Sequence, residues 1–119
     1  MRIKYKSIKL ERQCTNLKEA KKLFGGNESL ARSLLARVNA IYCAQALQDV
    51  IVMPSFRFHN LHGKREGSFA IDVKSRRDMW RIILRPLDEQ GEVFVSCRID
   101  EIASVVEIVE IMEVSAHYE

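Results

Sequence analysis

The first half of the chain carries apolar residues at helical spacing. Residues 17–24 place their apolar side chains on one face and run into Gly25-Gly26, which predicts a short helix that ends at the glycines. Asn27 is a candidate N-cap, because an Asn side chain accepts hydrogen bonds from the first turn, and the helix that it begins extends to about Gln48. The apolar stripe of this second helix is typical of a core-facing surface and comprises Leu30, Leu34, Leu35, Val38, Ile41 and Tyr42.

Alternation of apolar and polar residues takes over in the second half and predicts strands. The predicted strands span residues 3–7, 56–59, 68–73, 79–85, 92–98 and 105–114. Pro86 is expected to end the fourth of these, because proline cannot donate a hydrogen bond to a sheet. The last segment is ambiguous, since Glu107, Glu110 and Glu113 recur every third residue as in a helix, but its Val and Ile residues favour a strand.

Helices followed by a run of strands predict an α+β fold. We expect a single domain over residues 1–119, with two N-terminal helices packed on one face of a curved, mainly antiparallel sheet. The other face of the sheet is then available to bind a ligand. The chain is charged from its first residues and no segment approaches the length of a membrane span, so we expect a cytoplasmic protein with no membrane contact.

The cysteines do not indicate a metal site or a disulfide. Cys14, Cys43 and Cys97 are odd in number, far apart and without the spacing of metal ligands. We interpret them as reduced core residues, as in most intracellular proteins. We therefore expect no bound metal and no cofactor.

The charge of the chain is divided between its two ends. Residues 1–85 contain 18 Lys and Arg against 7 Asp and Glu, whereas residues 86–119 contain 1 against 9. Clustered cations attract phosphate and accelerate encounter with a polyanion, so the basic part indicates a nucleic-acid partner. RNA binding does not explain the acidic end, which either forms a side of the sheet away from RNA or contacts a partner protein.

The stretch from Arg57 to Arg85 combines basic residues with a tight turn. It holds 8 basic and 3 acidic residues, and residues 61–67 (Leu-His-Gly-Lys-Arg-Glu-Gly) place a histidine and two cations in the turn. An RNA-cleaving site needs such groups, although a solvated loop has the same pattern. The residues expected to contact the RNA backbone are Arg57, Lys74, Arg76 and Arg77.

Several short motifs follow one another in the second half of the chain. They are the segment His59 to Gly67, the strand Phe69 to Val73, the triplet Arg81-Ile82-Ile83, the strand Val106 to Ile111 and the tail His117-Tyr118. In this order and spacing they resemble the HigB-like toxins of the RelE/ParE superfamily, the toxin halves of type II toxin–antitoxin pairs. The resemblance covers nearly the whole chain.

What the resemblance implies is a RelE-like fold and a ribosome-dependent, metal-free messenger-RNA endonuclease, or mRNA interferase. It also implies a cognate helix-turn-helix (HigA-like) antitoxin, with operator DNA bound only through the toxin–antitoxin complex. By the matching motifs, the residues implied in catalysis are His62, Lys64, Arg65, Arg81, His117 and Tyr118.

These residue types suit metal-free RNA cleavage by the substrate's own 2′-hydroxyl. That reaction needs a base for the hydroxyl, cations for the charge on the phosphorane and an acid for the departing 5′-oxygen. Arginine forks onto phosphate oxygens, and histidine moves protons near neutral pH. Tyr118 is expected to stack on a base, bind phosphate or share the proton work.

Some residues of the same stretch have a structural interpretation. His59 alternates with Phe58 and is interpreted as structural, and Trp80 as a core residue. Asp72 stands where several relatives place a basic residue, so its carboxylate either points away from RNA or orients a neighbouring cation. The tail differs from the Asp-Tyr-His ending of many members, which leaves open which group carries each proton.

Two other functions fit the same sequence. A ParE-like toxin of the same fold acts on DNA gyrase instead of RNA, because one fold hosts several functions. A non-catalytic RNA-binding module binds RNA with strong salt dependence but does not cleave it. The histidines and cations favour the nuclease.

Overall fold

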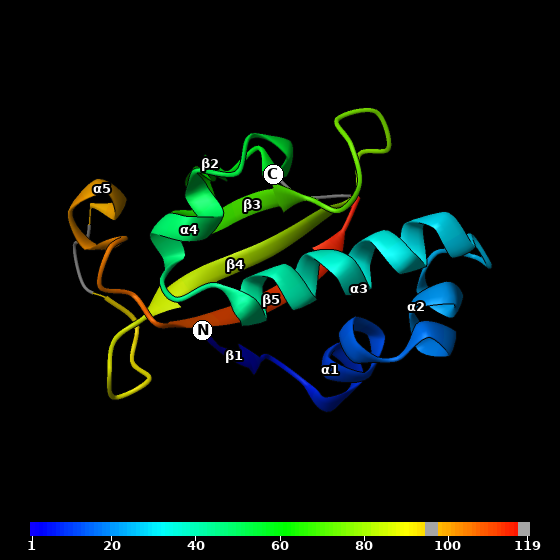
Figure 1. The fold of residues 1–119 in the computed structure, drawn as a ribbon, viewed down its shortest axis with the longest axis horizontal. Coiled ribbons are helices and arrows are strands. Elements are labelled where there is room, and N and C mark those ends of the chain that lie inside the picture. Colours follow the sequence, from blue (N-terminus) through cyan, green and yellow to red (C-terminus); the bar gives the residue numbers. More distant parts are fainter. Residues whose placement is uncertain (95–97, 117–119) are drawn as a thin grey trace.

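The strands of the protein form one mixed sheet in which the first and last strands are neighbours (Figure 1). The computed structural model describes residues 1–94 and 98–116, and in these ranges it contains a five-stranded sheet of order β1-β5-β4-β3-β2. The strands are β1 (Arg2–Tyr5), β2 (His59–Asn60), β3 (Phe69–Asp72), β4 (Arg81–Leu87) and β5 (Ile108–Ser115). β1 runs parallel to β5, and the other pairings are antiparallel. The predicted α+β class with a mainly antiparallel sheet is confirmed.

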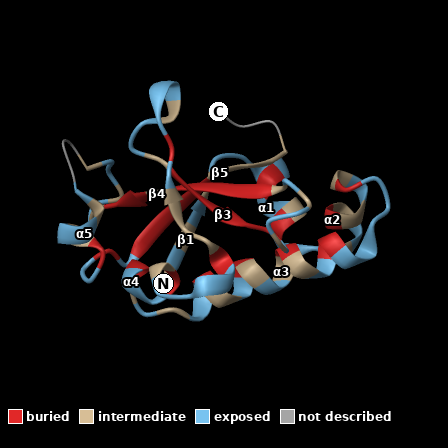
Figure 2. Ribbon diagram, turned by 90° about the horizontal axis from the view of Figure 1, so that it is seen from above, coloured by how far each residue is buried: buried red, intermediate tan, exposed pale blue. Residues whose placement is uncertain are grey.

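Helices cover one face of this sheet. They are α1 (Ile8–Thr15), α2 (Leu17–Leu23), α3 (Glu28–Cys43) and α4 (Leu47–Ile51), whereas the short α5 (Ile99–Ile102) lies beyond one end of the sheet. α3 runs along the sheet, and α1 and α2 pack against it. Figure 2 shows the buried residues gathered along the strands and on the sheet-facing side of α3. The side chains that α3 buries are Leu30, Ala31, Leu34, Val38 and Ile41.

Polar side chains determine where the helices begin. The side-chain oxygens of Ser7, Asn16 and Asn27 accept hydrogen bonds from the backbone N–H groups three residues later, in the first turns of α1, α2 and α3. The N-cap predicted at Asn27 is therefore confirmed, as is the short helix before the glycine pair. The predicted second helix is shorter than expected, because α3 ends at Cys43 and α4 follows separately.

The prediction of two N-terminal helices is wrong, since α1, α2, α3 and α4 all precede β2. The hydrophobic pattern does not predict α1 because only Leu10 and Cys14 of this helix are buried. Its Ser7 cap is the local signal that indicates a helix there.

The predicted strands at residues 3–7, 68–73 and 105–114 are confirmed as β1, β3 and β5. The boundary at Pro86 is wrong, because β4 continues through it. β3 pairs with β4 only as far as Leu84, so among the described residues no strand pairs with Pro86 on that side of β4 and needs the missing N–H.

Two other predicted strands differ from the structure. In the segment 56–59, Arg57 takes a left-handed conformation with φ of 50°, and β2 begins only at His59. In the segment 92–98, Val93 makes an isolated bridge to Leu87, and residues 95–97 lie outside the described residues.

Of the cysteines, Cys14 is buried and Cys43 is exposed. The core position predicted for Cys43 is therefore wrong, because this residue falls off the stripe that α3 buries. Cys97 lies outside the described residues. Within the described ranges, no helix has both the length and the apolar character that crossing a membrane requires.

Candidate functional site

The face of the sheet opposite α3 carries most of the predicted chemistry, and we call it the open face. Ile82 and Leu84 of β4 belong to the core under the helices. Because side chains alternate along a strand, Arg81, Ile83 and Arg85 point to the open face. Their neighbours in register on this face are Ala70 and Asp72 of β3 and Glu110 and Glu113 of β5.

A buried carboxylate holds two arginines at one end of the open face. Asp72 is 2% exposed, and Arg57 donates from Nε and Nη2 to its two oxygens over 3.0 and 3.2 Å. Nε of Arg81 lies 3.0 Å from Oδ1 of the same carboxylate. We call Arg57, Asp72 and Arg81 the arginine cluster. Of the two alternatives for Asp72, the structure shows that it orients neighbouring cations.

Arg81 is the buried arginine of the cluster. It is 4% exposed, and its guanidinium donates to the carbonyl oxygens of Trp80, Arg76 and Ser75 over 2.7, 3.3 and 3.4 Å. These carbonyls belong to the loop that joins β3 to β4. Arg81 therefore holds that loop, and its guanidinium reaches a phosphate only if these contacts break.

From the helix side, Arg37 of α3 binds both segments that carry the cluster. Its Nε donates to the backbone oxygen of Asp72 and its Nη2 to that of Ser55, each over 3.0 Å. The guanidinium also lies over the Phe56 ring, 4.3 Å from the centroid. Burial lowers the pKa of Arg37, an effect that nearby carboxylates oppose. The sequence pattern places Arg37 off the apolar stripe and assigns it no role, because its partners are distant in the chain.

Residues 61–67, which we call the glycine loop, fold back over the middle of the open face. Leu61 is buried against Ile83 of β4. Gly63 and Gly67 have φ of 68° and 90°, a left-handed conformation that residues with a Cβ rarely adopt. The two glycines thus allow the turn that brings the loop onto the sheet.

An ion pair joins the glycine loop to β5 beside the arginine cluster. The guanidinium of Arg65 pairs with the carboxylate of Glu113. Glu113 is two residues from Ser115, which lies opposite Arg81 in the sheet. Two residues of a strand span about 7 Å. The glycine loop and the arginine cluster are therefore neighbours on the open face.

The other predicted residues of the glycine loop face solvent. His62 and Lys64 are both exposed. His62 also lines a pocket of about 390 Å³ together with Arg98 and Asp100, next to α5. The structure therefore places these two side chains at the surface, within the same loop as Arg65.

His59 lies beside the arginine cluster, although the sequence interpretation makes it structural. Its Nδ1 is 2.7 Å from the carbonyl oxygen of Arg57. A carbonyl oxygen only accepts hydrogen bonds, so Nδ1 of the ring is the donor in this contact. β2 pairs His59 with Ala70, two residues from Asp72.

Exposed cations surround this end of the sheet. Lys74, Arg76 and Arg77 lie in the loop between β3 and β4, and all three are exposed. The ammonium of Lys74 donates to the hydroxyl of Ser29 at the start of α3. The side chain of Arg57 is 39% exposed. The four predicted RNA contacts therefore lie in two segments that the arginine cluster joins.

Trp80, in the same loop, packs against the core. Its ring meets that of Phe24 edge-on, with the ring centroids 4.8 Å apart. The interpretation of Trp80 as a core residue is confirmed.

β5 leads to the predicted catalytic tail. It ends at Ser115, in register with Arg81. His117 and Tyr118 lie outside the described residues, so their roles stay a prediction. The tail is joined to the sheet at the end that carries the arginine cluster.

Carboxylates of the acidic third supply partners for cations of the open face. Glu110 is 6% exposed, and its Oε1 accepts a hydrogen bond from Nε of Arg85 over 2.8 Å and lies 2.7 Å from Nη2 in an ion pair. Together with the pair between Arg65 and Glu113, this contact explains part of the acidity of β5 without a partner protein.

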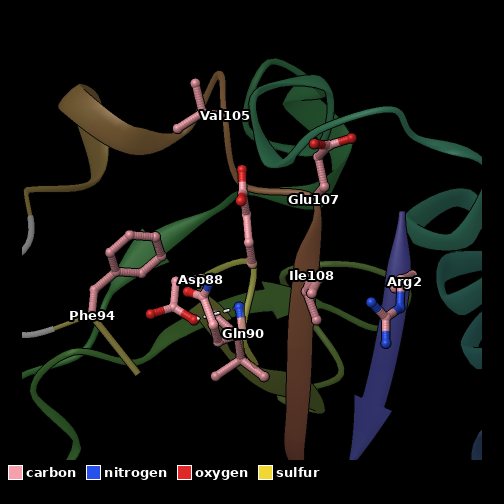
Figure 3. A pocket seen from close by; sticks show the side chains of 9 residues that line it. Arg2, Asp88, Gln90, Phe94, Val105, Glu107 and Ile108 are labelled. Atoms are coloured by element: carbon pink, nitrogen blue, oxygen red, sulfur yellow. Dashed lines mark hydrogen bonds between the residues drawn. The ribbon is translucent and has the colours of Figure 1, made fainter. Parts of the chain in front are cut away.

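A separate acidic pocket lies at the other end of the sheet (Figure 3). It has a volume of about 470 Å³, and its lining includes Asp88, Glu107, Arg2 and Phe94. Oδ1 of Asp88 accepts hydrogen bonds from the backbone of the turn that follows it. None of the described residues lining this pocket belongs to the predicted RNA site.

Within residues 1–94 and 98–116, no group of three or more His, Cys, Asp and Glu side chains is arranged to hold a metal ion. No protein-family model matches the chain, and no curated protein is significantly similar to it in sequence. The residues of the open face are therefore the candidates for function.

Proposed function

We propose that the protein is a HigB-like toxin of a type II toxin–antitoxin pair, a ribosome-dependent endonuclease that inhibits translation by cutting messenger RNA. The observation that carries the proposal is the juxtaposition of His59, the arginine cluster and the glycine loop on the open face. One surface thereby combines two histidines with several arginines, the residue types that metal-free RNA cleavage needs. The RelE-like fold is part of the proposal, supported by a sheet whose first strand runs parallel beside its last.

In this proposal the two arginines of the cluster have different tasks. Arg57 contacts the scissile phosphate, because its side chain is 39% exposed, whereas that of Arg81 is buried. Asp72 and Arg81 are positioning residues, since both are buried and hold Arg57 and the adjoining loop. Lys64 and Arg65 of the glycine loop add positive charge where the phosphorane forms.

Proton transfer is assigned to the histidines and the tail. The exposed ring of His62 accepts the proton of the 2′-hydroxyl. His117 or Tyr118 supplies the proton for the departing 5′-oxygen. Attack by the 2′-hydroxyl needs no metal and leaves a 5′-hydroxyl on the downstream fragment. A helix-turn-helix antitoxin silences this activity, and operator DNA binds only the toxin–antitoxin complex.

The proposal is tested by inducing the protein in bacteria together with a matched pair of variants. The wild-type chain should arrest growth and translation while chromosomal DNA stays intact. Arg57→Ala should relieve the arrest, because loss of one donor that stabilises transition-state charge costs about 10²- to 10³-fold in rate. Arg32→Ala is the control, since Arg32 is an exposed arginine of α3 that pairs with Glu28. This variant should remain toxic.

The alternatives give other results in the same experiment. DNA breaks with intact messenger RNA would instead support action on gyrase. Salt-sensitive binding to ribosomes with no growth arrest would support an RNA-binding module without catalysis. Growth at the normal rate with soluble wild-type protein present would contradict both toxin functions.

A further inference from the structure

β1 leaves one of its two edges open. In the sheet order β1-β5-β4-β3-β2, β1 pairs only with β5 among residues 1–94 and 98–116. The N–H groups of Arg2 and Lys6 donate to Glu107 and Ile111 on the β5 side. Because consecutive residues of a strand direct their backbone groups to opposite sides, those of Ile3 and Tyr5 point to the open edge. An unpaired edge of this kind is a template for a further strand.

An apolar groove runs along this open edge on its helix side. It has a volume of about 480 Å³ and lies between β1, α1 and α3. Apolar side chains in its lining include Ile3 and Tyr5 of β1 and Leu35 and Val38 of α3. Tyr42 also lines it, with 67% of its surface exposed. Alternate side chains of an added strand would therefore enter an apolar groove.

The opposite side of β1 is basic. Arg2 and Lys4 alternate with the apolar residues and are exposed. β5, which pairs with the other edge of β1, has residues that complement this alternation. Acidic Glu110 is the register partner of Lys4, and apolar Val109 is the register partner of Ile3. A strand on the open edge meets the same alternation of apolar and basic positions.

We propose that the open edge of β1 binds an extended segment of a partner protein in which acidic and apolar residues alternate. Its apolar side chains enter the groove, its carboxylates lie beside Arg2 and Lys4, and its backbone pairs with Ile3 and Tyr5. A second copy of this chain fits less well, because pairing β1 with β1 brings cations against cations. The groove lies on the helix side of the sheet, and Arg2 and Lys4 lie at its β1 edge, two strands away from β4 and the arginine cluster, so peptide binding is tested independently of RNA cleavage.

The test uses the full-length protein and a short synthetic peptide that alternates glutamate and valine. Amide hydrogen exchange, followed by NMR, should slow by at least about tenfold at Ile3 and Tyr5 when the peptide is added, because new backbone hydrogen bonds protect those amides. The amide of Lys4 should change little, because it already faces β5. A peptide that alternates lysine and valine should give no protection.

Variants of α3 test whether the peptide binds in the groove or elsewhere on this helix. Asn39→Trp fills the groove and should weaken peptide binding by about tenfold or more, since Asn39 is exposed and lines it. Ala36→Trp is the matched control, an exposed position of α3 outside the groove lining, and should bind normally. Replacing both Arg2 and Lys4 by Gln should weaken binding about three- to tenfold, as expected for two exposed ion pairs.

Three results would overturn the proposal. One is the absence of protection at Ile3 and Tyr5 at saturating peptide. Another is equal binding of the lysine peptide. The third is a concentration-dependent dimer of the wild-type chain that Asn39→Trp abolishes, which would assign the groove to a second copy.

Discussion

Replacing Arg81 by alanine should destabilise the fold more than the same change at Arg57. Arg81 is 4% exposed, and it pairs with buried Asp72 while donating to three backbone carbonyls of the adjoining loop. Removing one partner of a buried ion pair costs about 3–5 kcal/mol. A domain of this size has a free energy of unfolding of about 5–15 kcal/mol, so the variant should lose at least about a fifth of it. Arg57 is 39% exposed and Arg81 still pairs with Asp72 in its absence, so its loss should cost less, about 1–3 kcal/mol.

Urea denaturation of the two variants measures this difference. Trp80, the single tryptophan of the sequence, reports fluorescence from the loop that Arg81 holds. Far-UV circular dichroism reports the whole fold, so coincident transitions distinguish global unfolding from local opening. A value for Arg81→Ala within about 1 kcal/mol of the wild type, or equal values for the two variants, would refute the positioning role of Arg81.

Three further outcomes follow from the structure. Burial raises the pKa of Cys14 and of Tyr5 to about 12, from 9.0 and 10.0, so above pH 9 the unfolded chain holds fewer protons than the folded one. The free energy of unfolding should then fall as the pH rises from 9 to 12, and Tyr5→Phe should flatten the upper part of the decline in pH-dependent urea titrations. In a variant that lacks Cys97, a thiol reagent should label exposed Cys43 quickly and buried Cys14 only on unfolding, as mass spectrometry of timed samples would show. Removal of residues 117–119 should stop RNA cleavage and shift the melting temperature by only about 2 °C, because terminal residues contribute little to a core; retained cleavage would exclude the tail from proton transfer.

Local patterns predict those elements whose cause is local. The helix cap at Asn27 depends on a side chain three residues from its partner, and β3 and β5 depend on runs of apolar residues. The apolar pattern does not predict α1, because few residues of this helix are buried and the pattern is therefore weak. The predicted end of the strand at Pro86 is wrong because proline interrupts a strand only where a neighbouring strand needs its N–H. The local sequence does not show where the neighbouring strand β3 ends.

The candidate site is less predictable because its contacts join distant segments. The turn residues 61–67 are recognisable as a possible site, and the two outcomes for Asp72 follow from its charge. The contact that decides between those outcomes is the one between Asp72 and Arg57, which is 15 residues away in the sequence. Arg37 is 35 residues from Asp72 and binds its backbone oxygen. Every residue has a backbone oxygen, so no residue type in the sequence indicates this contact. The burial of Arg81 likewise follows from the loop that encloses it.

The central claim is that this chain cuts messenger RNA through the 2′-hydroxyl, and end mapping of RNA from a purified translation reaction tests it most directly. Added protein should produce fragments with a 5′-hydroxyl only when ribosomes are present. A transcript that carries a 2′-O-methyl group at the cleavage position should remain whole, because the attacking hydroxyl is blocked. Arg57→Ala should slow cleavage by about 10²- to 10³-fold, and Arg32→Ala should leave it unchanged. Intact RNA at full occupancy of the ribosome by wild-type protein, or cleavage of the methylated transcript, would contradict the account.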